Sequence, residues 1–85
     1  MTIYFDKTCG YWNNDNKLNE YYVNHTMDYM RELVKHRGYV YLNQIFEALG
    51  ATWDTRMGNL CIEDENFTVV IGWDCRNDRW VIDIY

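Results

Sequence analysis

The amino-acid sequence predicts an α+β fold, in which one long and one short helix pack on an antiparallel sheet of three to four strands. Apolar residues recur at helical spacing over residues 17–37, and a shorter helical pattern ends at Gly50. The residues after position 60 alternate between apolar and polar side chains, as strands do. A chain of 85 residues is expected to form a single domain, residues 1–85, around one core.

The long helix is predicted over residues 17–37. Its apolar stripe consists of Val23, Met27, Met30 and Val34, flanked by Leu33, Tyr22 and Tyr29. His25 and charged residues fall on the opposite side. The last turn is basic, which favours the negative end of the helix dipole, and Gly38 is the residue type that ends helices in a left-handed conformation.

The remaining elements before position 60 are short. Residues 3–5 have the composition of a strand, and residues 6–16 are polar and Asn-rich, which predicts a loop. Residues 39–42 predict an extended entry into the second helix, with Asn43 as its cap and Gly50 at its end. The apolar face of this helix is Ile45, Phe46 and Leu49.

The carboxyl-terminal part predicts an antiparallel meander. Period-two alternation occurs in residues 60–63, 67–73 and 80–85. Residues 64–66 and 74–78 are short, polar and contain Asn, which predicts hairpin turns between these strands. Residues 51–59 are predicted to be a loop that leads into the sheet.

Charge and cysteine content exclude several classes of protein. The net charge is -5: residues 1–50 carry six acids and five bases, whereas residues 51–85 carry seven acids and three bases. Direct binding to nucleic acid or to an anionic membrane is disfavoured, because both depend on basic side chains. An odd number of cysteines, three, without a Cys-x-x-Cys pair predicts free thiols, and the first residues lack a secretion signal, so an intracellular protein is expected.

No catalytic or metal-binding constellation stands out, so neither an enzyme nor a bound cofactor or metal is expected. His25 and His36 would lie about 16 Å apart along one helix, too far to share an ion. The chain has no serine, and Cys75 beside Arg76 is the best candidate for a reactive thiol. Four acids could pair for hydrolytic chemistry, but no spacing brings two of them together: Asp54, Glu63, Asp74 and Asp83.

Two sets of residues predict protein recognition. The acidic set is Glu63, Asp64, Glu65, Asp74 and Asp78. These carboxylates could imitate phosphates and enter the basic groove of a partner, or they could serve solubility alone. The aromatic set is Tyr11, Trp12, Tyr39 and Tyr41. Tyr and Trp dominate binding hot spots, although these rings could also pack on the protein's own sheet.

One stretch resembles a family of small uncharacterised proteins encoded by phages and prophages of Gram-positive bacteria. The residues that carry this resemblance are Tyr39-Val40-Tyr41-Leu42-Asn43-Gln44-Ile45-Phe46-Glu47-Ala48-Leu49-Gly50, then Thr52 and Gly58, and the closing Asp78-Arg79-Trp80-Val81-Ile82-Asp83-Ile84-Tyr85. The similarity covers about residues 39–85. Ala51 stands where the family often has Pro, and Gly72-Trp73 lies within a predicted strand rather than after the loop.

The resemblance implies a mobile genetic element and a location in the host bacterial cytoplasm. In that setting we expect an accessory protein that binds and inhibits a host protein with a basic surface, such as a CRISPR effector nuclease, in an anti-CRISPR-like manner. One alternative is a phage structural or assembly protein that self-associates, as a homodimer for example, through aromatic faces. Another is a small redox protein or enzyme that uses Cys75.

Overall fold

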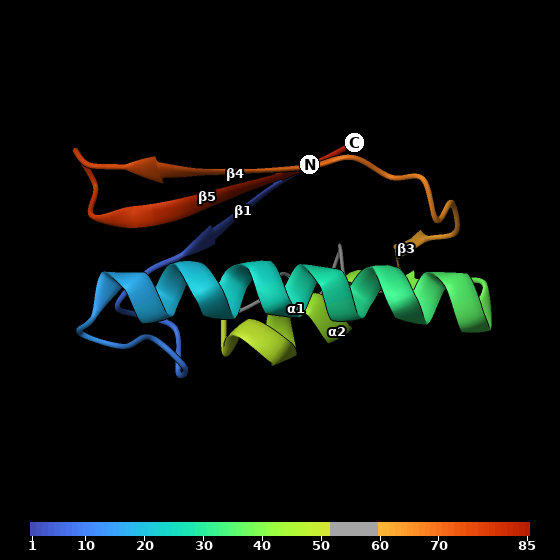
Figure 1. Cartoon of the computed structure of the whole chain (residues 1–85), viewed down its shortest axis with the longest axis horizontal. Helices are drawn as coiled ribbons and strands as arrows, with labels where there is room; N and C mark the ends of the chain where they lie inside the picture. The colour runs from blue at the N-terminus through green and yellow to red at the C-terminus, as the bar shows by residue number, and fades with distance from the viewer. Residues whose placement is uncertain (52–59) are drawn as a thin grey trace.

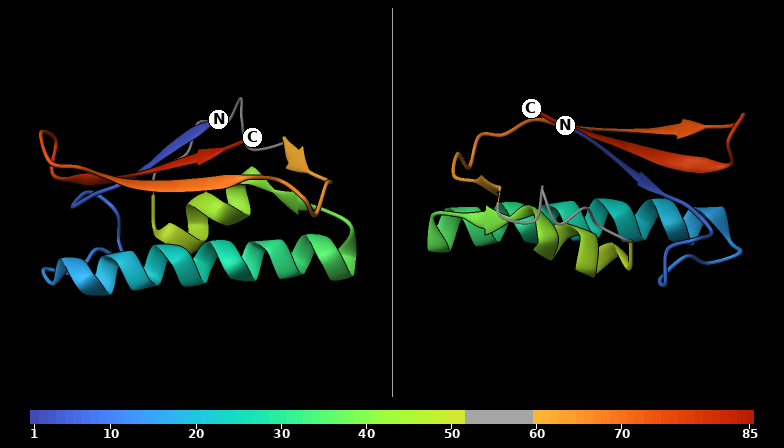
Figure 2. Two further views of the ribbon diagram at one scale, coloured as in Figure 1. Left: turned by 45° about the horizontal axis from the view of Figure 1, so that its top comes forward. Right: turned by 180° about the vertical axis from the view of Figure 1, so that it is seen from behind.

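The computed structural model describes residues 1–51 and 60–85, and it has two layers. A three-stranded sheet forms one layer, and the two helices lie together on one side of it (Figures 1 and 2). The elements are β1 (Thr2–Phe5), α1 (Asn16–Arg37), β2 (Val40–Tyr41), α2 (Leu42–Leu49), β3 (Cys61–Ile62), β4 (Val69–Asp74) and β5 (Arg79–Ile84). The predicted α+β class, with one long and one short helix on antiparallel strands, is therefore confirmed. Neither described helix is both long and apolar enough to cross a membrane.

Helix α1 forms where its apolar periodicity predicts it, beginning one residue earlier. The Asp15 side chain accepts a hydrogen bond from the backbone N–H of Lys17 at 3.0 Å, which caps the first turn. At the other end Gly38 adopts φ 91° and donates its N–H to the carbonyl of Val34 at 2.8 Å. The predicted stripe of Val23, Met27, Met30 and Val34 is buried. This stripe holds the helix against the sheet.

The three-stranded sheet places β5 between β1 and β4, and both pairings are antiparallel. Its inner face carries the apolar set Ile3, Phe5, Val69, Ile71, Trp80, Ile82 and Ile84. No described element covers the outer face (Figure 2). The alternation in residues 67–73 and 80–85 therefore predicts the sheet correctly, and so does the strand composition of residues 3–5.

The predicted meander is wrong in one strand. Strand β3 pairs with β2 in a separate two-stranded sheet, with Val40 opposite Ile62, and it does not join β4. Residues 64–66 consequently connect two sheets instead of closing a hairpin. The physical reason lies in α1: Arg31 donates hydrogen bonds to the backbone carbonyls of Glu65 at 3.0 Å and Phe67 at 2.8 Å. These bonds hold the connection along the helix.

The N-cap of helix α2 lies two residues before the predicted cap, Asn43. Tyr41 is its N-cap residue, and the Gln44 side chain accepts the Tyr41 backbone N–H at 3.0 Å. The early start follows from burial, because Leu42 packs in the core as the first residue of the helical face. The end at Gly50, with φ 71°, agrees with prediction. The loop predicted over residues 51–59, with Thr52, Asp54 and Gly58, lies almost entirely outside the described residues.

Candidate protein-binding surface

The loop before α1 is ordered by a buried amide. Asn19, only 1% exposed, accepts the backbone N–H of Asn13 at 2.8 Å and returns a bond to the Asn13 carbonyl at 2.7 Å. At the middle of the loop the Gly10 N–H donates to the carbonyl of Gly50 at 2.8 Å. These bonds fix the loop against both helices, and so they fix where Tyr11 lies.

An aromatic cluster occupies the surface between this loop, α1 and α2. We name it the aromatic face and define it as Tyr11, Tyr21, Tyr22, His25 and Tyr29. Tyr11 and Tyr22 have ring centroids 5.9 Å apart, and Tyr21 stacks on His25 at 5.8 Å with an interplanar angle of 8°. An open groove of about 400 Å³ lies within the face, lined by Tyr11, Tyr22, His25, Thr26, Tyr29 and Ala48.

Within the aromatic face, Tyr22 is held between the two helices, whereas three other tyrosines are largely exposed. The Tyr22 hydroxyl donates to the backbone carbonyl of Ala48, which joins α1 to α2. Burial raises the pKa of the Tyr22 phenol above its ordinary value, so Tyr22 stays a neutral donor at physiological pH. By contrast Tyr11, Tyr21 and Tyr29 are 59%, 69% and 58% exposed. Rings this exposed contribute little to the protein's own core.

Carboxylates border the aromatic face on α1. A second hollow of about 450 Å³ adjoins His25 and Tyr29 and is lined also by Asp28, Arg31 and Glu32. The Arg31 guanidinium donates hydrogen bonds to the backbone carbonyls of Glu65 and Phe67, just before β4. His36 lies 3.1 Å from a carboxylate oxygen of Glu32. The hollow therefore holds two carboxylates against one guanidinium, and these carboxylates could contact cationic side chains of a partner.

The structure separates the four aromatic residues that the sequence predicts as binding residues. Tyr11 belongs to the aromatic face. Trp12 is half-buried and packs on Phe5, with ring centroids 5.4 Å apart, so it serves the core. Tyr39 and Tyr41 are exposed and meet edge to face at 5.3 Å, with the Arg37 guanidinium 4.5 Å from the Tyr39 ring centroid. They form a smaller pair at the far end of α1.

The five acidic residues do not form one face. Glu63, Asp64 and Glu65 are exposed in the connection between β3 and β4. Asp74 and Asp78 lie in the β4–β5 hairpin, at the opposite end of the sheet layer (Figure 1). The length of β4 separates the two groups.

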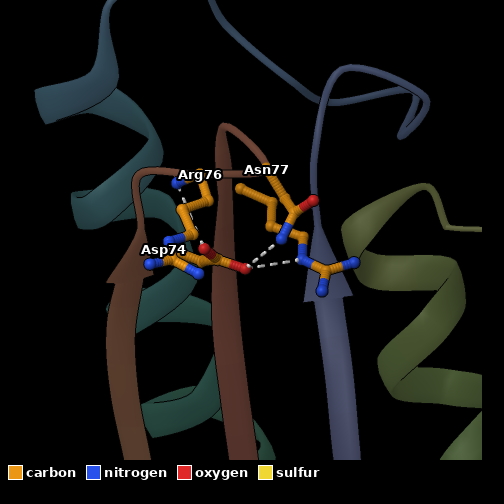
Figure 3. Close-up of polar contacts among 4 residues, drawn as sticks. Asp74, Arg76 and Asn77 are labelled. Atoms are coloured by element: carbon orange, nitrogen blue, oxygen red, sulfur yellow. Dashed lines mark hydrogen bonds and ion pairs between the residues drawn. The ribbon is translucent and has the colours of Figure 1, made fainter.

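Asp74 is bound within its own turn. The side-chain amide of Asn77 donates to its Oδ2 at 2.8 Å, Arg79 Nε donates to the same oxygen at 3.2 Å, and the Arg76 N–H donates to Oδ1 at 3.2 Å (Figure 3). The Asn77 bond, followed by Arg79 and the turn N–H groups, holds the pKa of Asp74 below its ordinary value. This carboxylate shapes the hairpin, whereas Asp78 supplies the turn's left-handed residue at φ 52°.

The cysteines are free, as the sequence predicts; Cys9 is buried, and Cys61 and Cys75 are exposed. Burial raises the pKa of Cys9, and a hydrogen bond to the Glu63 carboxylate, with Sγ and Oε1 3.3 Å apart, raises that of Cys61. Cys75 is exposed, and no described residue forms a hydrogen bond with its thiol. Across residues 1–51 and 60–85, no three His, Cys, Asp or Glu side chains gather in a geometry for a metal ion.

The carboxylates considered for hydrolytic chemistry are also apart. Asp83 accepts the Thr2 hydroxyl at 2.6 Å on the outer face of the sheet, Asp74 is held in the hairpin, and Glu63 follows β3. Asp54 lies outside the described residues.

Comparison of the chain with protein-family models, with curated proteins and with solved structures finds no match. Sequence reasoning misses most of the aromatic face, because it places Tyr22 and Tyr29 beside the core and His25 on a solvated side. The signal that could have found it is the spacing of Tyr21, His25 and Tyr29 at i, i+4 and i+8, which puts three rings in one exposed stripe.

Proposed function

We propose that this protein is a non-enzymatic binding protein that occupies a basic surface of another protein through its aromatic face. The observation that carries the proposal is the exposure of Tyr11 and Tyr29 at one groove, with the exposed Tyr21 stacked on His25 of the groove lining. Tyrosine presents a large contact area with few rotatable bonds, so a partner that covers such rings gains affinity at a small entropic cost.

The chemistry of the partner follows from charge. The aromatic face borders Asp28 and Glu32, and the whole chain carries a net charge of -5. Arginines of this chain already lie over its own rings, with Arg31 at 4.5 Å from the Phe67 centroid and Arg79 at 3.7 Å from that of Tyr4. Guanidinium groups of a partner would find the same contact on the exposed tyrosines, strengthened by nearby carboxylates.

The biological part of the proposal is inhibition of a bacterial defence or nucleic-acid-handling protein by a phage or mobile-element accessory protein. It is supported by the resemblance to phage-encoded proteins over residues 39–85 and by the acidic character of the chain. A protein that binds nucleic acid has a basic groove, and occupying that groove would block access of its substrate. Glu63, Asp64 and Glu65, exposed in one connection, would add electrostatic steering toward such a groove.

The experiment that tests this function is affinity capture from a lysate of a Gram-positive bacterium that carries CRISPR and other defence nucleases. Three baits are compared: the wild type, the double variant Tyr21→Ser/Tyr29→Ser, and the control Tyr85→Ser. Tyr85 is 73% exposed but lies at the end of β5, outside the aromatic face. The variants thus remove exposed rings at different places on the surface, and these replacements should change the stability of the protein little.

We expect a nucleic-acid-binding protein on the wild type and on the control, released by added salt or by competing nucleic acid, and absent from the double variant. Capture of the same proteins by all three baits would contradict the role of the aromatic face. Capture only of proteins without a basic nucleic-acid groove would contradict the inhibitory function while leaving protein binding in place.

A further inference from the structure

The edge of the three-stranded sheet at β4 has its own hydrogen-bonding pattern. Thr68 and Tyr85 exchange both backbone bonds, with the Thr68 N–H 2.6 Å from the Tyr85 carbonyl and the reverse bond at 2.9 Å. In an antiparallel pair such bonded positions alternate with unbonded ones. Counting along β4 from Thr68, residues Val70, Gly72 and Asp74 turn their backbone groups toward β5. The N–H and C=O groups of Val69, Ile71 and Trp73 therefore point outward, away from the sheet.

This edge lacks the features that keep strands from pairing between molecules. Its sequence, Val-Val-Ile-Gly-Trp-Asp, contains no Lys, no Pro and a single charge. That charge, Asp74, is tied to Arg79 in the hairpin. Within the part of the chain that the structure describes, no strand lies on the outer side of β4, since the sheet order is β1-β5-β4. The edge is thus open and rich in residues that favour strands.

We propose that β4 pairs with β4 of a second copy of this chain, antiparallel about a two-fold axis at Ile71, to form a continuous six-stranded sheet. The outward-pointing backbone N–H and C=O groups determine the register of this pairing. When Ile71 faces Ile71 of the other copy, Val69 faces Trp73 and Trp73 faces Val69. All three outward residues of one copy then exchange both backbone bonds with outward residues of the other.

Side-chain chemistry in this register favours a second copy as the occupant. On the inner face Ile71 meets Ile71, and Val69 meets the Trp73 ring, which is an aromatic and β-branched pair of the kind that stabilises sheets. On the outer face Val70 lies opposite Gly72, whose missing side chain leaves open space around it. Asp74 lies opposite Thr68 and not opposite a second Asp74. The only charged residue of β4 therefore does not face the same charge on the second copy.

The helices agree with this arrangement. In the same register both copies keep their helices on one side of the joined sheet, and the two-fold axis runs the α1 helices antiparallel. A cavity of about 130 Å³ between α1 and β4 is lined by Asn24, Met27, Asp28, Arg31, Val69 and Ile71. The side of α1 next to this cavity carries one acidic and one basic residue, Asp28 and Arg31, so it presents no excess charge of one sign to a second copy.

The pairing is independent of the proposed function. The aromatic groove reaches Ala48 of α2, whereas the side of α1 next to β4 carries Asn24, Asp28 and Arg31. A dimer through β4 consequently leaves both aromatic grooves free, while Asp28 and Arg31 line the hollow beside Tyr29 as well as the cavity next to β4. Net charge opposes association of two acidic copies at long range, but the Debye length is about 8 Å at physiological ionic strength, and added salt should strengthen the dimer.

The first measurement is the mass of the full chain by sedimentation across a concentration series. We expect a species of twice 10.4 kDa that dissociates on dilution and is favoured by salt. The variant Trp73→Lys, which places a charge against Val69 of the other copy, should be monomeric. The control Val70→Lys changes a residue of the same strand that is 47% exposed on the outer face, and it should remain dimeric.

The second measurement tests the register by disulfide formation, which does not depend on how a charged variant folds. In a background with Cys61→Ser and Cys75→Ser, Ile71→Cys should cross-link two copies under mild oxidation. Directly opposed bonded residues have Cα atoms about 5.5 Å apart, within the range for disulfides. Val70→Cys faces Gly72 and should not cross-link. A monomeric wild type at every concentration, a dimeric Trp73→Lys variant, or equal cross-linking of the two cysteine variants would overturn the proposal.

Discussion

Replacement of Gly50 by Ala probes the contact that fixes the loop beneath the aromatic face. Gly50 has φ 71°, and a Cβ atom there would lie 2.7 Å from the Gly10 nitrogen and 2.9 Å from Cδ2 of the Tyr11 ring. Gly38 is the matched control, because its φ of 91° is equally left-handed but an added Cβ meets nothing within 4 Å. Comparison of the two variants therefore separates the cost of a left-handed backbone from the cost of the contact with the loop.

Strain alone costs about 1 kcal/mol for a non-glycine residue in the left-handed region, so Gly38→Ala should lower the free energy of unfolding by about that amount. Gly50→Ala adds a collision with backbone, for which overpacking costs of about 1–3 kcal/mol are usual, giving a total of about 2–4 kcal/mol. Urea denaturation followed by circular dichroism measures both. Equal losses for the two variants would refute the reasoning, because the loop would then yield freely and could not hold Tyr11 in place.

Two further changes test polar contacts of the fold. Arg31→Met removes the donor to the carbonyls of Glu65 and Phe67 and should lower the free energy of unfolding by about 2 kcal/mol. The exposed control Lys35→Met should lower it by less than about 0.5 kcal/mol. Similar losses for both variants would contradict the role of Arg31 in holding the connection between β3 and β4. Asp74→Asn tests pH dependence: because the folded-state pKa of Asp74 lies below its ordinary 3.8, the wild type should exceed the variant in stability above that pH and lose the advantage as pH falls through the folded value. Unfolding by urea between neutral pH and pH 2 measures this difference, and an advantage that persisted at the acid end would argue against ionised Asp74 as the hairpin's acceptor.

The parts of the fold that could be predicted from sequence are those with a long local period. Helix α1 repeats its apolar spacing over 22 residues, and β5 alternates over six, so both are recognisable without tertiary information. Strands β2 and β3 have two residues each, too few to show a period, and their pairing joins positions about twenty residues apart. Local pattern therefore predicts the neighbouring strand β4 as the partner of β3, whereas β3 pairs with β2 and Arg31 holds the β3–β4 connection along α1.

The candidate site was less predictable because it depends on which rings remain after the core is filled. Trp12 and Tyr29 look alike by pattern, yet Trp12 packs on Phe5 whereas Tyr29 stays exposed. The acidic residues pose the same difficulty. Their turns are recognisable, but whether the turns share an end of the sheet is decided by strand pairing.

The most direct test of the account is the affinity of the captured partner for the three baits, measured by calorimetry with purified proteins. Loss of two tyrosine contacts that together supply about 2 kcal/mol corresponds to a weakening of about 30-fold. We expect at least that loss for Tyr21→Ser/Tyr29→Ser and a change of less than about twofold for Tyr85→Ser. Equal dissociation constants for the wild type and the double variant would contradict binding through the aromatic face.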